Sequence, residues 1–392
     1  MKAVKNSLIF ILLILCNSTY SQQLRIGIFR DVATKQVIFD YAKGSYSIYV
    51  DTGYYASILP SESVQLQVSA NNQIELKHNY QVVGKYKSIK LIENQPNSNL
   101  SIQVTQPKTK VRKYQNDFEI FAKDGVLTIV NLVDIDNYLA GVVESEGGGG
   151  KQLEYYKVQA LISRSYLFKY FSKHEKEGFS VCDRVHCQAY HSMMRFTPTI
   201  DSAVKATKNL VMEDENNTLI DAFFHANCGG QTSEAKYVWN NNIAYLNSFK
   251  DTFCIYTKQA VWDKRISQQE WADFLVQQYN YPINDSVYGP LIFTFNQPDR
   301  MAFYHSSLLG IPLRDIRDRF KLRSTFFNVY PDGTDVILTG RGYGHGVGLC
   351  QEGAMKMALF GYSFRQIALY YFPGAHIVDR QRDEFFKYVT DW

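Results

Sequence analysis

Residues 134–170 read DIDNYLAGVVESEGGGGKQLEYYKVQALISRSYLFKY, and they predict two helices joined by a run of four glycines. Asp134 or Asp136 can cap a short first helix that directs its Leu and Val side chains inward. Lys157 and Arg164 of the second helix are seven positions apart and are expected to share its outer surface. The opposite face should be buried, because apolar and small residues recur there at intervals of three and four: Leu153, Tyr156, Ala160, Ser163, Leu167 and Tyr170.

The chain before these helices alternates apolar and polar residues in short runs broken by turn residues. The runs are LRIGIF (24–29), YSIYVD (46–51), VQLQVS (64–69), QIELKH (73–78), YKSIKLI (86–92) and LSIQV (100–104). Period two predicts an antiparallel β-rich module over residues 22–115, and a further strand over 126–133 leads into the helices. The module contains no catalytic combination of residues, so we expect it to serve as a scaffold or a binding unit.

The chain after the helices predicts further helices around 267–279 and 312–320 and a strand near 335–338. Residues 340–373 read GRGYGHGVGLCQEGAMKMALFGYSFRQIALYYFP, which indicates a glycine-rich loop followed by two helices separated at Gly361. We therefore expect the fold class to be α+β, with the N-terminal β module in front of a mixed domain over 116–392.

Composition excludes disorder as the main state, because 45% of the 392 residues are hydrophobic and 20% are charged. A net charge of +4 does not indicate a nucleic-acid partner. Residues 1–21, MKAVKNSLIFILLILCNSTYS, have a basic start, a short apolar run and small residues before Gln22, which predicts a secretory signal peptide. The apolar run is too short for a transmembrane helix, so an exported protein is expected, with lipidation at Cys16 as a less favoured alternative.

Loss of Cys16 with the signal peptide would leave five cysteines, an odd number for an exported protein. We favour a structural disulfide between Cys228 and Cys254, which leaves Cys350 as the odd thiol beside the glycine-rich loop. His225, in FFHANCGGQTSE (223–234), could instead help to line a site.

Two cysteines and two histidines lie within fourteen residues at His174, Cys182, His186 and Cys187. They have the chemistry of a tetrahedral zinc site, although adjacent ligands are less usual than looser spacings. The rival interpretation is a Cys182–Cys187 disulfide in an oxidising compartment. Cys187 as a nucleophile with His186 as its base is a poor third, because neighbours on a strand point to opposite faces.

Glu146 is the candidate general acid, since partial burial at a groove edge would raise its pKa and keep it protonated near neutrality. The alternative is a solvated residue at a helix end. Glu144 is two residues away and should not face Glu146 on a helix. A conventional glycosidase needs two carboxylates, so a single one favours an intramolecular reaction in which a hydroxyl of the sugar itself attacks.

His345 lies among alternating glycines in GRGYGHGVG (340–348), which is not a phosphate loop because the Lys-Ser/Thr pair is missing. Alternating glycine allows tight backbone packing around one ordered imidazole. A structural and a site role for His345 are about equally compatible with this pattern.

Several blocks occur in an order that resembles the stage II sporulation protein D family (SpoIID/LytB): DIDNYLAGVVESE, KVQALISRSY, HCQAY, AVKATKNLVM, FFHANCGGQTSE, LRSTFF and GRGYGHGVGLCQEGA. The resemblance runs from about residue 126 to 378. It implies a mixed α+β domain around a glycan groove and lytic transglycosylation of peptidoglycan strands that have lost their stem peptides. It also implies residue roles: Glu146 matches the catalytic glutamate, and the candidate substrate-binding residues are Arg164, Tyr166, Gln188, Tyr190, His345 and Gln351.

On this resemblance the C6 hydroxyl of N-acetylmuramic acid attacks and leaves a 1,6-anhydro end. Zinc in the His/Cys cluster, found in some members, would be structural because four protein ligands already fill its positions. The family usually has bulkier residues after its glutamate than Gly147–Gly150, and its motifs do not cover the β module. Two other functions stay open: a non-catalytic glycan-binding enhancer of a cell-wall amidase, as for LytB-type members, and a zinc hydrolase.

Overall fold

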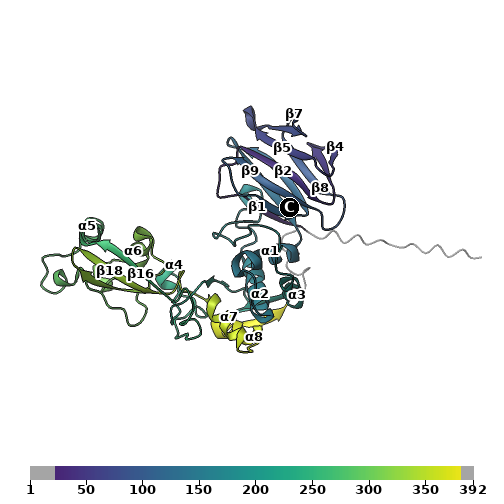
Figure 1. Ribbon diagram of the computed structural model, residues 1–392. Coiled ribbons are helices and arrows are strands. Elements are labelled where there is room, and N and C mark those ends of the chain that lie inside the picture. The colour runs from purple at the N-terminus through teal and green to yellow at the C-terminus, as the bar shows by residue number, and fades with distance from the viewer. Residues whose placement is uncertain (1–22, 381–392) are drawn as a thin grey trace, which may run out of the picture.

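The computed structural model describes residues 23–380, which form three lobes (Figure 1). β-sheets make the first lobe, helices α1, α2, α3, α7 and α8 lie together in the middle, and a smaller lobe with α5, α6, β16 and β18 lies beyond them. The expected α+β class is confirmed. The expected signal peptide over residues 1–21 and the alternative of lipidation at Cys16 lie outside the described residues.

The first lobe is built from two sheets, antiparallel except for one short parallel pair, whose alternating apolar side chains share one core. The larger sheet contains, in spatial order, β13 (Val181–Cys182), β1 (Leu24–Ile28), β12 (Val126–Val133), β11 (Asp117–Lys123), β8 (Ser88–Glu93), β3 (Tyr46–Val50) and β4 (Gly53–Ile58). The smaller sheet contains β10 (Arg112–Gln115), β9 (Asn99–Gln106), β2 (Gln36–Lys43), β5 (Ser63–Val68), β6 (Ile74–His78) and β7 (Gln81–Tyr86). All six runs expected as strands are strands, and the strand expected over 126–133 is β12.

The larger sheet joins parts of the chain from both sides of residue 115. Strand β1 pairs antiparallel with β12 and parallel with β13, the short strand that begins the candidate zinc segment. Strand β11 lies between β12 and β8. Strands from before and after residue 115 therefore lie in one sheet, and the β module and the helical part share one continuous core.

Helix α1 (Ile135–Gly147) begins at Asp134, whose side chain accepts the N–H of Asp136 over 2.8 Å, as expected of a cap. Helix α2 (Leu153–Lys169) packs against α1, α3 (Thr199–Ala206), α7 (Gln351–Leu359), α8 (Phe364–Tyr371) and β14 (Leu210–Glu213). Because α2 has neighbours on several sides, almost every residue from Tyr155 to Leu167 is buried. The expectation of one buried stripe with Arg164 on the outer surface is wrong, since Arg164 is only 2% exposed.

Short pairs of strands hold the C-terminal helices to the rest of the middle lobe. Strand β15 (Phe224–His225) pairs with β19 (Leu349–Cys350), and β14 pairs with β20 (His376–Asp379). The glycine-rich loop leads through β19 into α7, and Gly361 separates α7 from α8, as expected.

The third lobe is an insertion with its own core around the fully buried Trp271, which the sequence did not indicate as a separate unit. Its sheet contains β16 (Val261–Ser267), β18 (Asp335–Arg341) and β17 (Phe327–Asp332). The expected helices are α5 (Gln268–Tyr279) and α6 (Leu313–Phe320), while α4 (Lys236–Trp239) precedes the lobe. Short 3-10 turns complete the elements: Ala70–Asn72, Glu175–Glu177, Gly289–Leu291 and Ser307–Leu309.

Among residues 23–380 no helix combines the length and apolar character needed to cross a membrane.

Candidate functional site

Glu146 lies in the last turn of α1, half-buried, with its carboxyl directed at the segment after β13. The backbone N–H of Ala189 donates to Glu146 Oε1 over 2.7 Å. Burial raises the pKa of Glu146, and this Ala189 hydrogen bond opposes the rise only in part. The position is therefore that of a held, partly desolvated acid rather than a freely solvated helix-end carboxylate.

Glu144 is directed elsewhere, as expected for residues two apart on a helix. Its two carboxylate oxygens accept the N–H groups of Phe196 and Arg195, each over 2.9 Å. The contacts described for Glu146 within residues 23–380 include no second carboxylate. The site as described offers one carboxyl, which restricts the chemistry it can perform without a substrate group taking part.

Gln351 binds the backbone of the last turn of α1, which carries Glu146. Its side-chain amide donates to Glu146 O over 3.3 Å and to Gln159 Oε1 over 3.2 Å. Tyr155 of α2 in turn donates to Gln159 Oε1 over 3.4 Å. The first residue of α7 thus connects the end of α1 to the buried face of α2.

Two glycines shape the path of the chain around Glu146. A Cβ on Gly141 would lie 2.5 Å from Ser192 O and 2.5 Å from the ring of Tyr190, so only glycine lets the 188–192 segment lie so close to α1. Gly148 ends α1 at a φ of +64°, and its N–H donates to Glu144 O. The hydroxyl of Tyr156 donates to Gly148 O over 3.0 Å and tethers the glycine run to α2.

Four of the expected substrate-binding residues, Arg164, Tyr166, Gln188 and Tyr190, are buried and bonded to protein groups. Gln188 donates to Ser163 O over 3.2 Å, while the Tyr190 hydroxyl donates to Asn131 Oδ1 over 3.1 Å. Tyr166, Gln188 and Tyr190 thus make hydrogen bonds that hold the 186–190 segment, whereas Arg164 bonds elsewhere. A role for them in binding substrate stays a prediction.

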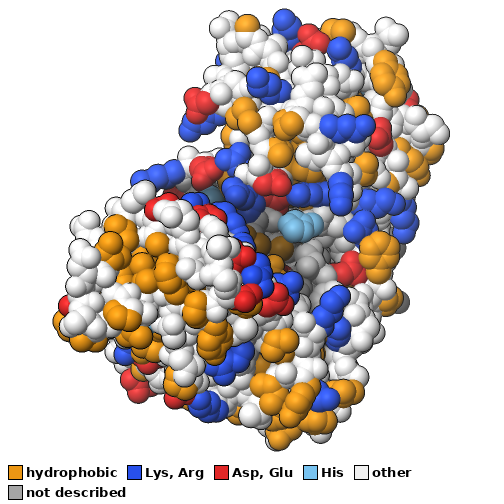
Figure 2. Space-filling model, turned by 60° about the vertical axis from the view of Figure 1, so that its left-hand side comes forward, with side chains coloured by type: hydrophobic (Ala, Val, Ile, Leu, Met, Phe, Trp, Pro, Cys, Tyr) orange, Lys and Arg blue, Asp and Glu red, His pale blue; other side chains and the backbone are white. Residues whose placement is uncertain are grey.

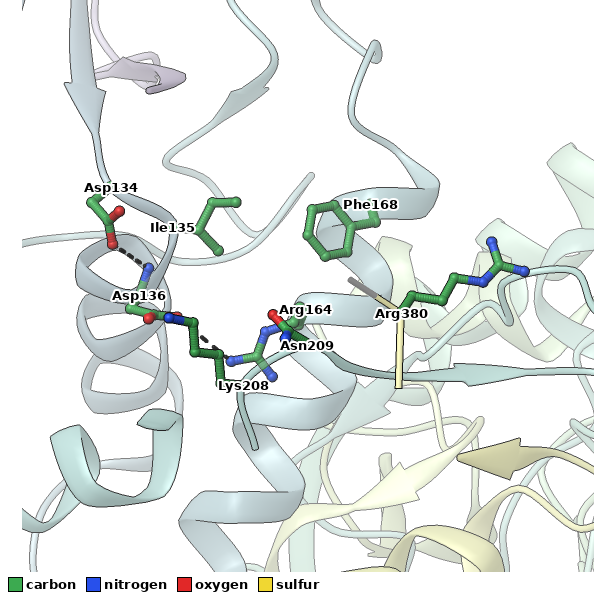
Figure 3. A pocket seen from close by; sticks show the side chains of 8 residues that line it. All are labelled: Asp134, Ile135, Asp136, Arg164, Phe168, Lys208, Asn209 and Arg380. Atoms are coloured by element: carbon green, nitrogen blue, oxygen red, sulfur yellow. Dashed lines mark hydrogen bonds and ion pairs between the residues drawn. The ribbon is translucent and has the colours of Figure 1, made fainter. Parts of the chain in front are cut away.

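Arg164 spans the interior between α2 and α3. Its guanidinium donates to Thr207 O over 2.6 Å and to Val204 O over 3.3 Å, and burial lowers its pKa to about 10. It borders a small pocket of about 80 Å³ that is also lined by Asp134, Ile135, Asp136, Phe168, Lys208, Asn209 and Arg380 (Figure 3). This pocket lies at the first turn of α1, and a rise of 1.5 Å per residue places it about 16 Å along the axis from Glu146.

The four candidate zinc ligands come together beside the Glu146 segment. One ligand atom from each of His174, Cys182, His186 and Cys187 lies within 4.8 Å of the others. His186 Nδ1 is 3.9 Å from Cys182 Sγ and 3.9 Å from Cys187 Sγ. Both cysteines are free, so the alternative disulfide between them is not formed.

The surroundings of His174 fit a metal ligand. Its Nε2 is buried and has no hydrogen-bond partner, whereas its Nδ1 lies 2.5 Å from Glu177 Oε1. A histidine ligand commonly donates its second ring N–H to a carboxylate, which leaves the other nitrogen free for the metal. The hydrogen bond between the two cysteines lowers the pKa of Cys182 and raises that of Cys187, so it favours one thiolate, the form of cysteine that binds zinc. Zinc therefore fits this cluster as a tetrahedral Cys2His2 centre.

The cluster and Glu146 meet through one short stretch of chain. Cys187 is followed by Gln188 and Ala189, so the cluster anchors the backbone whose N–H binds Glu146. Tyr166, another residue we expected to contact substrate, donates its hydroxyl to His186 O over 3.2 Å. The cluster and the N–H that binds Glu146 thus belong to one short stretch of backbone.

His345 belongs to a separate group of rings with His225, Phe223 and Trp239. Its ring centroid lies 5.1 Å from Trp239, 5.6 Å from His225 and 6.5 Å from Phe223. Burial lowers the pKa of His345 to about 4, and its Nδ1 accepts the N–H of Val347 over 3.0 Å. His225 Nδ1 lies 3.0 Å from Val347 O, and its buried Nε2 has no partner.

Sequence reasoning missed Gln159 and Ala189, and it gave His225 only a passing role. Gln159 lies inside an apolar helical pattern, and Ala189 contributes only its backbone N–H. The sequence therefore gives no local pattern that identifies either residue. His225 and His345 could have been paired, because each lies beside glycines in a short block, but their contact depends on the pairing of β15 with β19.

The cysteines near these rings differ from the expectation. Cys228 and Cys254 are free, with their sulfurs 3.2 Å apart, and Cys350 joins them instead of standing alone. The expected disulfide is not formed in the structure. The start of α7 brings a third thiol into the same buried cluster.

The surface is hollowed between the β-sheet lobe and the lower lobes (Figure 2). Lys and Arg side chains gather around this hollow together with Asp and Glu, and a histidine lies exposed within it. The walls are thus mainly polar and of mixed charge on this face.

Comparison with known proteins gives a consistent group of relatives. The family model described as "Stage II sporulation protein" (SpoIID) matches residues 123–213, which contain Glu146 and all four ligands of the His/Cys cluster. An uncharacterised protein of Brachyspira hyodysenteriae is 26% identical over 344 residues, covering 87% of this chain and 89% of its own length. Stage II sporulation protein D of Bacillus amyloliquefaciens is 27% identical over 284 residues, covering 67% and 78%. The protein named amidase enhancer of Bacillus subtilis is 25% identical over 289 residues, covering 60% of this chain and 39% of that protein.

Proposed function

Because the chain belongs to the SpoIID family through residues 123–213, we propose that it is an exported lytic transglycosylase that cleaves peptidoglycan strands lacking stem peptides. The family match and the relative named amidase enhancer support a cell-wall-related role. The observation that carries the finer proposal is the half-buried Glu146 carboxyl, held by Ala189 and raised in pKa.

The proposed reaction uses Glu146 twice. Its protonated carboxyl donates a proton to the glycosidic oxygen while the bond from that oxygen to C1 of N-acetylmuramic acid breaks. The C6 hydroxyl oxygen then bonds to C1 and passes its proton to the Glu146 carboxylate. One strand end is a 1,6-anhydro sugar, the other is a free hydroxyl, and the acid is protonated again without consumption of water.

The surroundings of Glu146 support a mechanism in which Glu146 is the acid and then the base, while a hydroxyl of the substrate is the nucleophile. A general acid works best when its pKa lies close to the operating pH, and burial moves the pKa of Glu146 in that direction. A hydrolytic mechanism calls for a second carboxylate across the scissile bond. Glu144, the nearest glutamate in sequence, is bonded to the backbone of Arg195 and Phe196. An internal hydroxyl of the substrate removes the need for that second group.

Zinc, in this proposal, is structural. His174, Cys182, His186 and Cys187 fill the four positions of a tetrahedral ion, and a catalytic zinc keeps one position open for water. The ion would keep the 182–190 segment in place and supply no chemistry to the sugar. A zinc hydrolase is disfavoured for the same reason.

The test is mass spectrometry of the products formed from amidase-treated peptidoglycan by the mature protein and by its Glu146→Gln variant. We expect anhydro-muramyl ends from the wild type and none from the variant. Glu144→Gln is the control, because it makes the same change two residues away and keeps one of the two backbone hydrogen bonds that Glu144 accepts, and it should remain active. Reducing ends, or full activity of Glu146→Gln, would refute the mechanism.

A second candidate function is a non-catalytic glycan-binding module that enhances a cell-wall amidase. The similarity over 289 residues to the relative named amidase enhancer favours it. Its signature would be binding to glycan strands with no anhydro product under any condition, together with faster release of stem peptides when a cell-wall amidase is added. Glu146→Gln should leave such an enhancement unchanged.

A further inference from the structure

Cys228, Asp251, Cys254 and Cys350 form a second potential ligand set, separate from the His/Cys cluster. One ligand atom from each lies within 4.8 Å of the others, and all four residues are buried. They come from three places in the chain: Cys228 follows β15, Asp251 and Cys254 lie in the loop before β16, and Cys350 lies at the start of α7. We propose that these residues bind a second structural metal ion, a zinc held by three thiolates and one carboxylate.

The distances fit a common centre. Cys228 Sγ lies 3.2 Å from Cys254 Sγ and 3.3 Å from Asp251 Oδ2. Thiolate sulfurs at about 2.3 Å and a carboxylate oxygen at about 2.0–2.2 Å from a tetrahedral zinc require separations of about 3.5–3.8 Å between ligand atoms. Shifts of a few tenths of an ångström therefore suffice to admit the ion.

Groups around the cluster are arranged to support ionised ligands. The N–H of Cys228 donates to Cys350 Sγ over 3.3 Å, and the N–H of Gly353 donates to the same sulfur over 3.4 Å at the start of α7. Backbone donors and a helix N-terminus both favour a thiolate. The hydroxyl of Tyr371 donates to Asp251 Oδ2 over 2.8 Å, as is usual for a carboxylate that binds a metal.

Charge favours a metal over a disulfide here. A Cys228–Cys254 disulfide would leave Cys350 as an unpaired buried thiol, and the cluster would contain no positive charge to balance the fully buried Asp251 carboxylate. The buried Arg300 is close, but its guanidinium donates to Cys228 O and Gln231 O rather than to Asp251. A divalent ion neutralises two of the four ligand charges, and the nearby Arg300 guanidinium offsets part of the remainder. Binding the ion releases the three thiol protons to solvent. Soft sulfur ligands in tetrahedral number select zinc.

The ion would close the base of the inserted lobe. Cys254 precedes β16 and Cys350 follows β18, so one metal ties the incoming and outgoing chains of that lobe to Cys228. Cys350 is also the residue before Gln351, which holds the backbone of Glu146. The second ion thus sits one residue from a support of the candidate acid, while touching none of the groups assigned to the reaction.

The test uses the full mature chain with Cys182→Ser and Cys187→Ser, which removes the first cluster and keeps all four ligands of the second. After reduction and exposure to zinc alone, followed by removal of free metal, we expect one retained zinc by elemental analysis. X-ray absorption should place three sulfurs and one oxygen around it. Adding Cys350→Ser should abolish retention. The chain used in the test begins at Gln22, so it does not contain Cys16.

Wild-type protein provides a second measurement if the double variant does not fold. Two zinc ions per chain with an average sulfur count between two and three per ion are expected from one Cys2His2 and one Cys3Asp centre. A single zinc with two sulfurs would overturn the proposal. So would an intact mass that shows Cys228 joined to Cys254, or three titratable thiols with no retained metal in the double variant.

Discussion

The N–H of Ala189 donates to Glu146 Oε1 over 2.7 Å, and this hydrogen bond joins the end of α1 to the 182–190 segment, which carries three of the four candidate zinc ligands. A backbone donor lowers the pKa of a carboxyl, while burial raises it, and the balance for Glu146 is a net rise. The position of the 182–190 segment therefore affects both where the acid lies and how readily it ionises.

The pH dependence of cleavage follows from that net rise. The protonated carboxyl of Glu146 is the active form in the first step, so the rate should fall as pH increases through its raised pKa. Initial rates of anhydro-product formation over about pH 4–8 measure this limb. Glu144→Gln should reproduce the wild-type profile, and a rate that climbs steadily with pH in this range would contradict the assignment of Glu146 as the acid.

Replacing Glu146 should also change how stability depends on pH. The folded pKa of Glu146 is above the unfolded value, so its contribution to stability is fully present below the unfolded pKa and is lost as pH rises through the folded one. Gln can still accept the Ala189 hydrogen bond but carries no charge to bury. The melting temperature of Glu146→Gln should therefore exceed that of the wild type at neutral pH, with the difference shrinking toward pH 4.

A control separates burial from the charge at the end of α1. A negative charge near a helix C-terminus is unfavourable, so removing either glutamate there raises stability slightly. Glu144→Gln includes that common part, but it also loses one of the two backbone hydrogen bonds of Glu144, because an amide nitrogen cannot accept an N–H. Its melting temperature is therefore a lower bound for the helix-end effect. If the two variants have equal melting temperatures at every pH, burial of the Glu146 carboxyl contributes nothing and the predicted difference is absent.

Local sequence patterns predicted the helices and strands around the site, but they did not predict which of these elements contact one another. Asp134 caps α1 as expected, and the alternating runs before residue 115 are strands, because capping and period two are properties of short segments. Strand β4, which reads GYYASI, was missed because its first three residues are exposed and give no alternation. Pairing of β1 with β13 brings residues near 26 and 181 together, and no local pattern encodes that.

Among the site residues, too, those brought together within a short segment were predicted, whereas contacts between distant segments were not. The spacing of His174, Cys182, His186 and Cys187 indicated their assembly, since a short segment can bring them together. Arg164 was expected on the surface because its helix was taken to have one buried face, whereas α3 covers the other side. Cys350 was expected to be alone because its distance in sequence from Cys228 hides the contact made through β15 and β19.

His174→Ala should reveal the supporting role of the first cluster. His174 precedes the 182–190 segment, so its removal disturbs the metal without changing any residue next to Ala189. We expect one zinc fewer per chain and a cleavage rate reduced by about tenfold or more, within the range seen when a reacting group is misplaced. Loss of the Ala189 N–H should also raise the pKa of Glu146, which moves the falling limb of the pH profile to higher pH.

If the cluster stabilised the fold without positioning Glu146, the falling limb of the pH profile would stay where it is in the wild type. His78→Ala is a suitable control, because His78 lies in the β module and pairs with Glu62. It should keep both the zinc content and the pH profile. A His174→Ala protein that loses zinc but retains the wild-type rate and pH limb would show that the cluster does not position the acid.

Gly141→Ala tests the close approach of α1 to the 188–192 segment. The new Cβ would lie 2.5 Å from Ser192 O and from the ring of Tyr190, so the segment must move away from α1. Overpacking of this kind costs about 1–3 kcal/mol, which the better helix propensity of Ala offsets by up to about 1 kcal/mol. Because Ala189 moves with its neighbours, cleavage should fall by on the order of 10²-fold. Gly53→Ala, whose nearest Cβ contact is 4.0 Å, should change neither the melting temperature nor the rate, and equal behaviour of both variants would show that the close approach is unimportant.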